Sequence, residues 1–243
     1  MTHPDAPFPE KNPGKGPRKG TPPRRSMPVW LETIVLLAIA LVLAIGIKTF
    51  FVQPFYIPSA SMEPGFVKND RILVEKMSYW GSGTPQRGDI VVFKDPGGWL
   101  PPSEDGSSTN PITKALSFIG LYPAGGHLVK RVIGIGGDRV SCASATSPLM
   151  VNGHALSESS YLPDGTRPCA SYPPFDVTVP AGHLWVMGDN RGDSADSRAH
   201  IDEPGKGFVA DDLVVGKVVA RVWPLDRFKI LHRPATFASV PAP

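Results

Sequence analysis

The sequence predicts a mainly β fold, an antiparallel, barrel-like domain that follows one N-terminal transmembrane helix. Residues 29–47 form an apolar run long enough to cross a bilayer. After this run come short segments rich in β-branched residues and separated by turns, in a chain with 28 prolines and 25 glycines among 243 residues. This composition is typical of strands and turns. No long amphipathic pattern competes, since residues 112–121 could form at most a short helix.

Residues 1–27 are expected to be a disordered basic tail. Residues 1–26 carry a net charge of +4 and have few apolar side chains. Such a segment cannot bury enough apolar surface to offset the entropy of ordering. The rest of the chain sums to −1, and the total of +3 is too small to suggest a nucleic-acid partner.

Residues 28–48 are expected to be a helical anchor in a lipid bilayer. As a helix, residues 29–47 would span about 28 Å, close to the thickness of the hydrocarbon core. The run exceeds the apolar part of a signal peptide, and no small-x-small cleavage site follows it. A buried core helix would show a polar face, which this run lacks. The basic tail predicts a cytoplasmic N-terminus and an extracytoplasmic remainder.

Residues 49–232 are expected to form the β domain. Its strand-like segments alternate apolar with polar residues or form short β-branched runs, and they are 70–77, 87–94, 127–135, 137–142, 148–156, 175–180, 183–190 and 213–223. Within them, the pair Asn152-Gly153 predicts a tight hairpin turn.

Three stretches after the anchor are not expected to belong to the main sheet. Residues 97–126 begin with a Pro/Ser/Asp/Gly-rich run, and residues 143–175 are similarly rich in turn formers, so both are expected to be surface excursions. Residues 233–243 are short and largely polar, and we expect a disordered C-terminal tail there.

The two cysteines favour a disulfide over a metal site. Cys142 and Cys169 lack C-x-x-C spacing and have no ligand cluster beside them, so the sequence predicts no metal. In an oxidising compartment a disulfide between them would stabilise the fold by about 3–4 kcal/mol. Two unpaired buried thiols are the alternative that the sequence leaves open.

Residues 57–64, IPSASMEP, place two serines in a turn between prolines. A loop serine is ordinarily solvated, and to act as a nucleophile Ser61 would need a base within hydrogen-bond reach. His127 and His183 each open a strand-like segment, where a histidine is more often structural.

Lys130 is the better candidate base. Strand alternation puts it on one face with Leu128 and Val132. A lysine in this position ordinarily extends its amine to water. If it is instead buried, desolvation lowers its pKa, and a neutral amine can accept the proton of Ser61, as in the Ser–Lys variants of the catalytic triad.

The polar run GDNRGDSADSR, residues 188–198, has several readings. It could be a polar turn, or a cation loop with Arg191 at a position that should hold a ligand. An adhesion tripeptide at 191–193 is too short to support that function. GIGGD at 134–138 lacks the spacing of a dinucleotide-binding loop.

Five motifs in order give the chain a resemblance to a known family. IPSASMEP, NDRILVEK, RGDIVVF, KRVIGIGGD and GDNRGDSADSR follow an N-terminal anchor, and together the chain from 30 to 223 resembles the bacterial type I signal peptidases, peptidase family S26. The resemblance implies a catalytic domain of coiled antiparallel β-barrels on the outer membrane surface. It implies that Ser61 is the nucleophile and Lys130 the general base, that Ser59 and the Ser61 backbone N–H form the oxyanion hole, and that Ser194 orients the lysine.

The resemblance also implies supporting residues. Asp196 and Arg198 match a pair that braces the loop. The residues that match the shallow substrate pockets are Phe55, Ile57, Pro58, Met62, Phe66, Ile72, Leu128 and Val129. The chain departs from the family at Gly65, where threonine is usual, and at Gly136, where proline is frequent, which puts substrate fit in doubt rather than catalysis.

The function so implied is a membrane-bound serine endopeptidase that needs no cofactor. Its partners would be secretory preproteins with small residues before the cut, bound as an added strand, and the enzyme is expected to be a monomer. Two alternatives stay open: a Ser–Lys protease with a single dedicated substrate, and a catalytically silent anchored domain that binds signal sequences.

Overall fold

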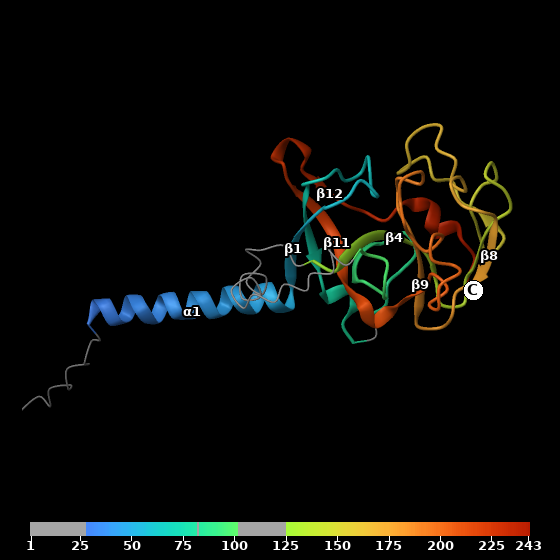
Figure 1. Cartoon of the computed structure of the whole chain (residues 1–243). Helices are drawn as coiled ribbons and strands as arrows, with labels where there is room; N and C mark the ends of the chain where they lie inside the picture. The colour runs from blue at the N-terminus through green and yellow to red at the C-terminus, as the bar shows by residue number, and fades with distance from the viewer. Residues whose placement is uncertain (1–27, 82, 102–124) are drawn as a thin grey trace, which may run out of the picture. The chain divides into compact units, whose positions relative to one another are not determined.

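The computed structural model describes residues 28–81, 83–101 and 125–243. The expected basic tail and most of the excursion at 97–126, with the short helix considered at 112–121, lie outside the described residues. Within the described part, the mainly β fold with one N-terminal apolar helix is confirmed (Figure 1).

Helix α1 runs from Val29 to Phe50. Its segment Val29–Ile47 is long and apolar enough to cross a membrane, and none of that segment is buried within the protein. A helix that shows apolar side chains on all sides is suited to a lipid environment rather than to water.

The larger sheet has eight antiparallel strands. Their order across the sheet is β1 (Val52–Tyr56), β2 (Arg71–Glu75), β11 (Val214–Trp223), β3 (Ile90–Lys94), β4 (His127–Ile135), β9 (His183–Met187) and β10 (Val209–Ala210), while β12 (Lys229–Ile230) pairs with β11. Short 3-10 helices lie in the connections, at Met77–Tyr79 (η1), Asp211–Leu213 (η2), Leu225–Arg227 (η3) and Ala235–Ser239 (η4).

The larger sheet curls so that distant strands approach one another. Three strands separate β1 from β4, yet the rings of Phe55 on β1 and His127 on β4 lie 5.4 Å apart. On its other side, β4 pairs with β9 only from Arg131 onward. Between β1 and the first residues of β4, two strand edges therefore face each other without a described strand between them.

A smaller sheet joins β7 (His154–Ala155), β6 (Met150–Val151), β5 (Arg139–Cys142) and β8 (Phe175–Thr178). The predicted turn is present, with left-handed φ values of 51° at Asn152 and 75° at Gly153. The stretch 143–175 thus contains a hairpin and is tied to the sheet by a disulfide between Cys142 and Cys169, whose Cα atoms are 5.7 Å apart.

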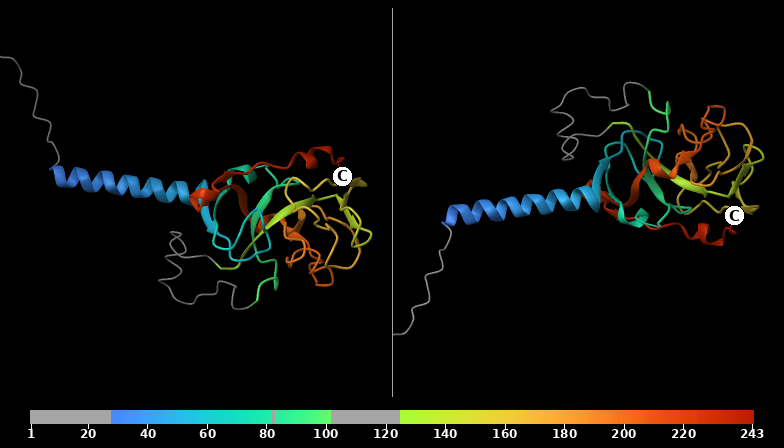
Figure 2. Two further views of the ribbon diagram at one scale, coloured as in Figure 1. Left: turned by 90° about the horizontal axis from the view of Figure 1, so that it is seen from above. Right: turned by 90° about the horizontal axis from the view of Figure 1, so that it is seen from below.

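The prediction of a disordered C-terminal tail is wrong for residues 233–243. Helix η4 places Phe237 and Val240 in the core cluster that also holds Trp185, and both side chains are buried. Asn152 donates a hydrogen bond to the carbonyl of Pro241 at 3.0 Å. Figure 2 shows the C-terminus beside the smaller sheet in both views. Two apolar side chains are enough here because the domain supplies the rest of the core, which local composition does not reveal.

Candidate active site

Ser61 lies in a turn that is fixed to the β domain by its apolar neighbours. Ile57, Met62 and Phe66 are almost fully buried in one core cluster. The backbone N–H of Ile57 donates to the carbonyl of Asp70 at 2.9 Å, and the N–H of Phe66 donates to the carbonyl of Met62 at 2.9 Å. The turn therefore presents Ser61 from an ordered backbone, and the residue itself is only 8% exposed.

Lys130 approaches this turn from strand β4. Its Nζ lies 2.6 Å from the Oγ of Ser61, and the residue is 4% exposed. As alternation predicts, Leu128 and Val132 belong to one apolar cluster beside it, although β4 is buried on both faces rather than on one. The amine is therefore buried, and its hydrogen bond goes to the serine hydroxyl.

Burial lowers the pKa of Lys130 from 10.5 to about 8. The carboxylate of Asp196 opposes this change, and the guanidinium of Arg198 adds to it. The amine can consequently lose its proton close to neutral pH, where it becomes able to accept one from a hydroxyl.

Ser59 brings a second hydroxyl to the same place. Its Oγ lies 3.3 Å from the Oγ of Ser61. Within the described part of the chain, the backbone N–H of Ser61 donates to no other group. A side-chain O–H and a backbone N–H are thus both available next to the reactive oxygen, as an oxyanion hole requires.

Asp196 and Arg198 form a buried ion pair beside the lysine. The guanidinium donates two hydrogen bonds of 2.9 Å to the carboxylate, and both side chains are completely buried. Burial alone would raise the pKa of Asp196, but the hydrogen bonds and the charge of Arg198 outweigh it and hold that pKa below its usual range. Arg198 also donates to the carbonyl of Arg191, and Asp196 accepts from the N–H of Gly188. The ion pair therefore joins the end of the loop 188–198 to its beginning.

Ser194 does not make the contact that the resemblance implied. Its hydroxyl is buried, but it makes no hydrogen bond to Lys130 or to any other group in the described residues. A Cβ atom on Gly188 would collide with this hydroxyl and with the carbonyl of Ser61. The close approach of the loop to the serine turn therefore depends on a glycine at 188.

One residue that joins the loop to the turn, Asn190, was not predicted from the sequence. The backbone N–H of Asn190 donates to the carbonyl of Ser61 at 3.0 Å, and its side-chain amide donates to the carbonyl of Ala60 at 3.2 Å. The only sequence feature that could have indicated this role is the position of Asn190 in GDN, the first three residues of the polar run 188–198.

Two further buried ion pairs attach the same loop to other parts of the domain. Asp189 accepts hydrogen bonds of 2.8 and 2.7 Å from Arg131, the neighbour of Lys130 on β4. Arg191 pairs with Glu158, which comes from the stretch 143–175. Glu158 had no signal in the sequence, because its partner is 33 residues away.

The predicted pocket residues surround the serine turn. Six of them lie in one apolar cluster, namely Phe55, Ile57, Met62, Phe66, Ile72 and Val129, while Leu128 is in the adjacent cluster and Pro58 is exposed. The two histidines that were considered as bases contact backbone carbonyls, of Gly125 for His127 and of Ala181 for His183.

The two glycine departures have different surroundings. A Cβ on Gly65 would meet its nearest neighbour, the carbonyl of Met62, at an ordinary 3.4 Å, so a side chain fits there. A Cβ on Gly136 would lie 3.0 Å from the Cα of Ala181, which is too close without a shift of the backbone. Glycine at 136 is therefore adapted to its surroundings, whereas glycine at 65 leaves free space beside the turn.

A buried amine hydrogen-bonded to a serine hydroxyl is the arrangement used by the Ser–Lys class of hydrolases, which work without a metal ion. Among the described residues, no three His, Cys, Asp or Glu side chains gather in a way that could hold a metal. The β domain and the site thus fit a serine hydrolase of that class.

Comparison with known proteins supplies the family. The family model "Signal peptidase, peptidase S26" matches residues 30–223. Signal peptidase I of Mycobacterium tuberculosis is 43% identical over 223 residues, 83% of this chain and 75% of the relative, and the probable signal peptidase I of Mycobacterium leprae is 40% identical, with 85% and 80% covered. A solved signal peptidase I from Enterococcus faecalis is 27% identical and covers 55% of this chain and 95% of its own at a TM-score of 0.32, too low to compare the folds. The chain belongs to the signal peptidase family S26 and is a membrane-anchored peptidase.

Proposed function

We propose that this peptidase removes signal peptides from exported preproteins, with Ser61 as nucleophile and Lys130 as general base. The observation that carries the proposal is the 2.6 Å contact between the Lys130 amine and the Ser61 hydroxyl, both buried. A free hydroxyl is a weak nucleophile, and a neutral amine at this distance can take its proton during attack.

In the first half of the reaction, the amide of the substrate becomes an ester of the enzyme. Neutral Lys130 accepts the proton of Ser61 while Oγ attacks the carbonyl carbon of the last residue of the signal sequence. The negative oxygen that forms accepts hydrogen bonds from the Ser59 hydroxyl and the Ser61 N–H, each worth about 3–4 kcal/mol in such sites. The lysine ammonium then protonates the leaving amine, and the mature protein departs.

In the second half, water replaces the leaving amine. Lys130 is neutral again after the first half and accepts a proton from a water molecule that attacks the ester. The same oxyanion contacts stabilise the second intermediate. Its collapse returns the proton to Ser61 and releases the signal peptide as a free carboxylate.

The substrate is proposed to bind as an extended strand between the free edges of β1 and β4. The ring contact of Phe55 with His127 brings these edges near each other, and β4 lacks a described partner on this side before Arg131. Main-chain hydrogen bonds would supply affinity along such edges. Ile57, Met62 and the other apolar residues beside Ser61 favour small, uncharged side chains before the cut.

The basic start of the chain supports an orientation with the N-terminus in the cytoplasm and the β domain outside. Six cations precede the apolar helix within residues 1–26, as the positive-inside rule expects of a cytoplasmic segment. The disulfide between Cys142 and Cys169 suits an oxidising exterior.

The test is cleavage of purified preproteins by the full chain in detergent. Ser61→Ala and Lys130→Ala should each abolish cleavage, because the first removes the attacking oxygen and the second removes the amine that accepts its proton. Lys94→Ala, which truncates an exposed lysine at the end of β3, is the matched control and should cleave normally.

A panel of unrelated preproteins distinguishes a general signal peptidase from a protease with one dedicated substrate. Cleavage of several of them after small-x-small sequences supports the proposal, whereas cleavage of one alone would indicate a dedicated protease. Binding of signal sequences without any cut by the unaltered enzyme would indicate a silent binding domain and refute the proposed dyad.

A further inference from the structure

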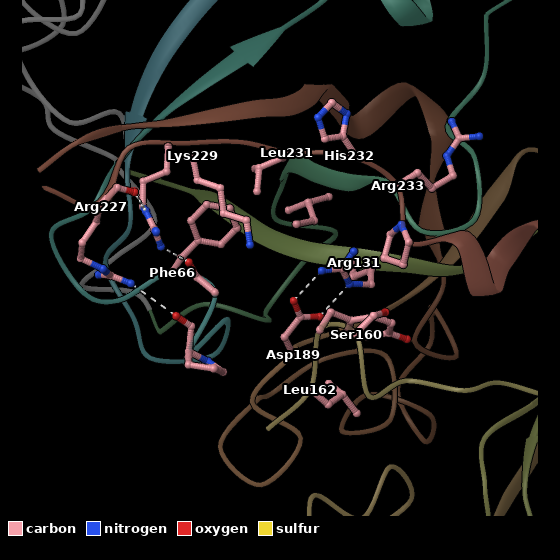
Figure 3. A pocket seen from close by; sticks show the side chains of 16 residues that line it. Phe66, Arg131, Ser160, Leu162, Asp189, Arg227, Lys229, Leu231, His232 and Arg233 are labelled. Carbon is pink, nitrogen blue, oxygen red and sulfur yellow. Dashed lines mark hydrogen bonds and ion pairs between the residues drawn. The ribbon is translucent and has the colours of Figure 1, made fainter. Parts of the chain in front are cut away.

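A pocket of about 560 Å³ is lined in part by Pro64, Gly65 and Phe66, which follow the serine turn, and does not include Ser61 or Lys130. Its walls come from Pro64–Phe66, from β4, from β12 and from the segments on either side of β12 (Figure 3). Five of the residues that line it carry a positive charge, Arg131, Arg221, Arg227, Lys229 and Arg233, and a single carboxylate, Asp189, faces them. Cations therefore outnumber carboxylates among the residues that line this pocket.

The carboxylates around this pocket do not balance the cations on one side of it. Asp70, buried behind the wall, pairs with Arg227 at 2.9 Å and with Arg221 at 3.7 Å. Two guanidinium groups thus share the carboxylate of Asp70, and the charge of Asp226 also acts on Arg221. Burial and the positive charge of Arg227 together lower the pKa of Arg221. Lys229 on β12 forms no ion pair with any residue that the structure describes.

The other side of the pocket shows the same imbalance. Asp89 is shared between Lys217 at 2.9 Å and Arg233 at 3.1 Å. Arg131 uses both oxygens of Asp189, so that carboxylate has no charge left for a further cation. Figure 3 shows Arg227 and Lys229 at one side of the pocket and Arg131 with Arg233 toward the other. The lining therefore keeps an excess of positive charge that an anion could neutralise.

We propose that this pocket binds a phosphate-bearing anion, either free phosphate or the headgroup of an anionic phospholipid. Guanidinium groups match the spacing of phosphate oxygens, and a lysine adds a compact charge to the same ligand. Lys229 has no carboxylate partner among the described residues, and Arg221 and Arg227 share Asp70, so the site keeps more positive than negative charge. A phosphate neutralises more of this charge per ligand than a single carboxylate does. Leu231 and Ile90 in the lining offer apolar contact to any organic part of the ligand.

Some of the cations have structural partners, and the test has to avoid them. Arg221 donates to the carbonyl of Gly65, and Arg227 donates to the carbonyl of Pro64, so both hold the chain that follows the serine turn. Lys229 is exposed on the two-residue strand β12 and makes no side-chain hydrogen bond within the described residues. Its side chain can therefore be replaced without removing a hydrogen bond or an ion pair that the structure describes.

The experiment is calorimetric titration of the full chain in neutral detergent at low salt. Sodium phosphate is one probe, dihexanoyl phosphatidylglycerol below its micellar concentration is the second, and dihexanoyl phosphatidylcholine is the zwitterionic control. We expect saturable binding of phosphate or phosphatidylglycerol, weakened about tenfold by Lys229→Glu, because the reversal changes the charge near the ligand by two. The matched reversal Lys94→Glu, outside the pocket, should leave binding unchanged.

The possible outcomes distinguish free phosphate from a phospholipid headgroup, and some of them would refute the proposal. Binding of sodium phosphate assigns a free anion, and binding of phosphatidylglycerol without phosphate assigns a lipid headgroup. No saturable binding of either up to about 10 mM, which is weaker than about 3 kcal/mol, overturns the proposal. Equal binding by the unaltered chain and by Lys229→Glu also overturns it. Lys229→Gln, which only removes the charge, provides a milder second variant, and an unchanged melting temperature shows that each variant is folded.

Discussion

Replacing Lys130 with methionine should make the protein more stable while removing its activity. Burial lowers the pKa of this amine from 10.5 to about 8, and one pKa unit corresponds to 1.36 kcal/mol. Keeping the charged amine in the folded protein therefore costs about 3 kcal/mol at pH 7. Methionine has a similar volume and no charge, so the variant avoids this cost. It also loses the hydrogen bond to Ser61, worth about 1 kcal/mol, which leaves a net gain of about 2 kcal/mol.

The gain should depend on pH in a definite direction. Between pH 8 and 10.5 the unfolded amine holds a proton that the folded amine has lost, so the stability of the unaltered protein rises with pH in this window. Below pH 8 the cost is present in full. The advantage of Lys130→Met should accordingly be largest at neutral pH. By about pH 10.5 it should have turned into a small loss of stability, because only the missing hydrogen bond to Ser61 remains.

Thermal and urea unfolding of the detergent-solubilised chain measure this difference. At pH 7 we expect a melting temperature higher by about 4–8 °C for Lys130→Met, given a described domain of this size. Lys217→Met is the control, because that lysine is paired with Asp89 at 2.9 Å and its loss should bring no gain. An unchanged or lower stability of Lys130→Met at pH 7, or a gain that persists at pH 10.5, would refute the reasoning.

Two other predictions concern the same site, and a third concerns the disulfide. The kcat/KM for a signal-peptide substrate should rise about tenfold from pH 7 to pH 9, because the Lys130 amine, with its pKa of about 8, loses its proton in this range. A flat pH profile in a stopped-flow peptide assay would contradict a lysine base. Ser59→Ala should reduce kcat by about 100- to 1000-fold with little change in unfolding, as loss of an oxyanion donor does. Replacing Cys142 and Cys169 with serine should lower the free energy of unfolding by about 3–4 kcal/mol, and equal urea midpoints with and without the disulfide would rule this out.

The strands of the larger sheet were predictable because their signals are local. Strand β4 occupies the range that the β-branched run predicted, and Asn152-Gly153 makes the expected turn. Strand β1 was missed because Pro54 interrupts its pattern, and proline is tolerated there only because β1 is an edge strand. Whether a strand lies at an edge depends on the topology and not on its own residues.

The site was predictable where residues of one motif act together. Ser59 and Ser61 lie in one turn, and the motif order pointed to Lys130, 69 residues further along the chain. The sequence could not decide whether this lysine is buried, because alternation gives a face of a strand but not what covers it. β4 is covered on both sides, by clusters assembled from distant segments.

The contacts that hold the loop 188–198 were not predictable for the same reason. Asn190 reaches a carbonyl 130 residues before it, and Arg191 reaches Glu158 in a stretch that looked like a surface excursion. Nothing in the sequence around any of these residues indicates its partner. The contacts form only because the fold brings the two segments of each pair together.

The ion pair beside the lysine explains why burial can set the basicity of Lys130. Asp196 alone would raise the pKa of the amine, and Arg198 alone would lower it. Because the two are joined by two hydrogen bonds of 2.9 Å, their effects on the lysine largely cancel, and desolvation remains as the dominant influence. A lone carboxylate in this position would keep the lysine protonated and useless as a base. The loop therefore needs both charges buried together. This accounts for an ion pair that adds little stability of its own beside an amine that must lose its proton easily near neutral pH.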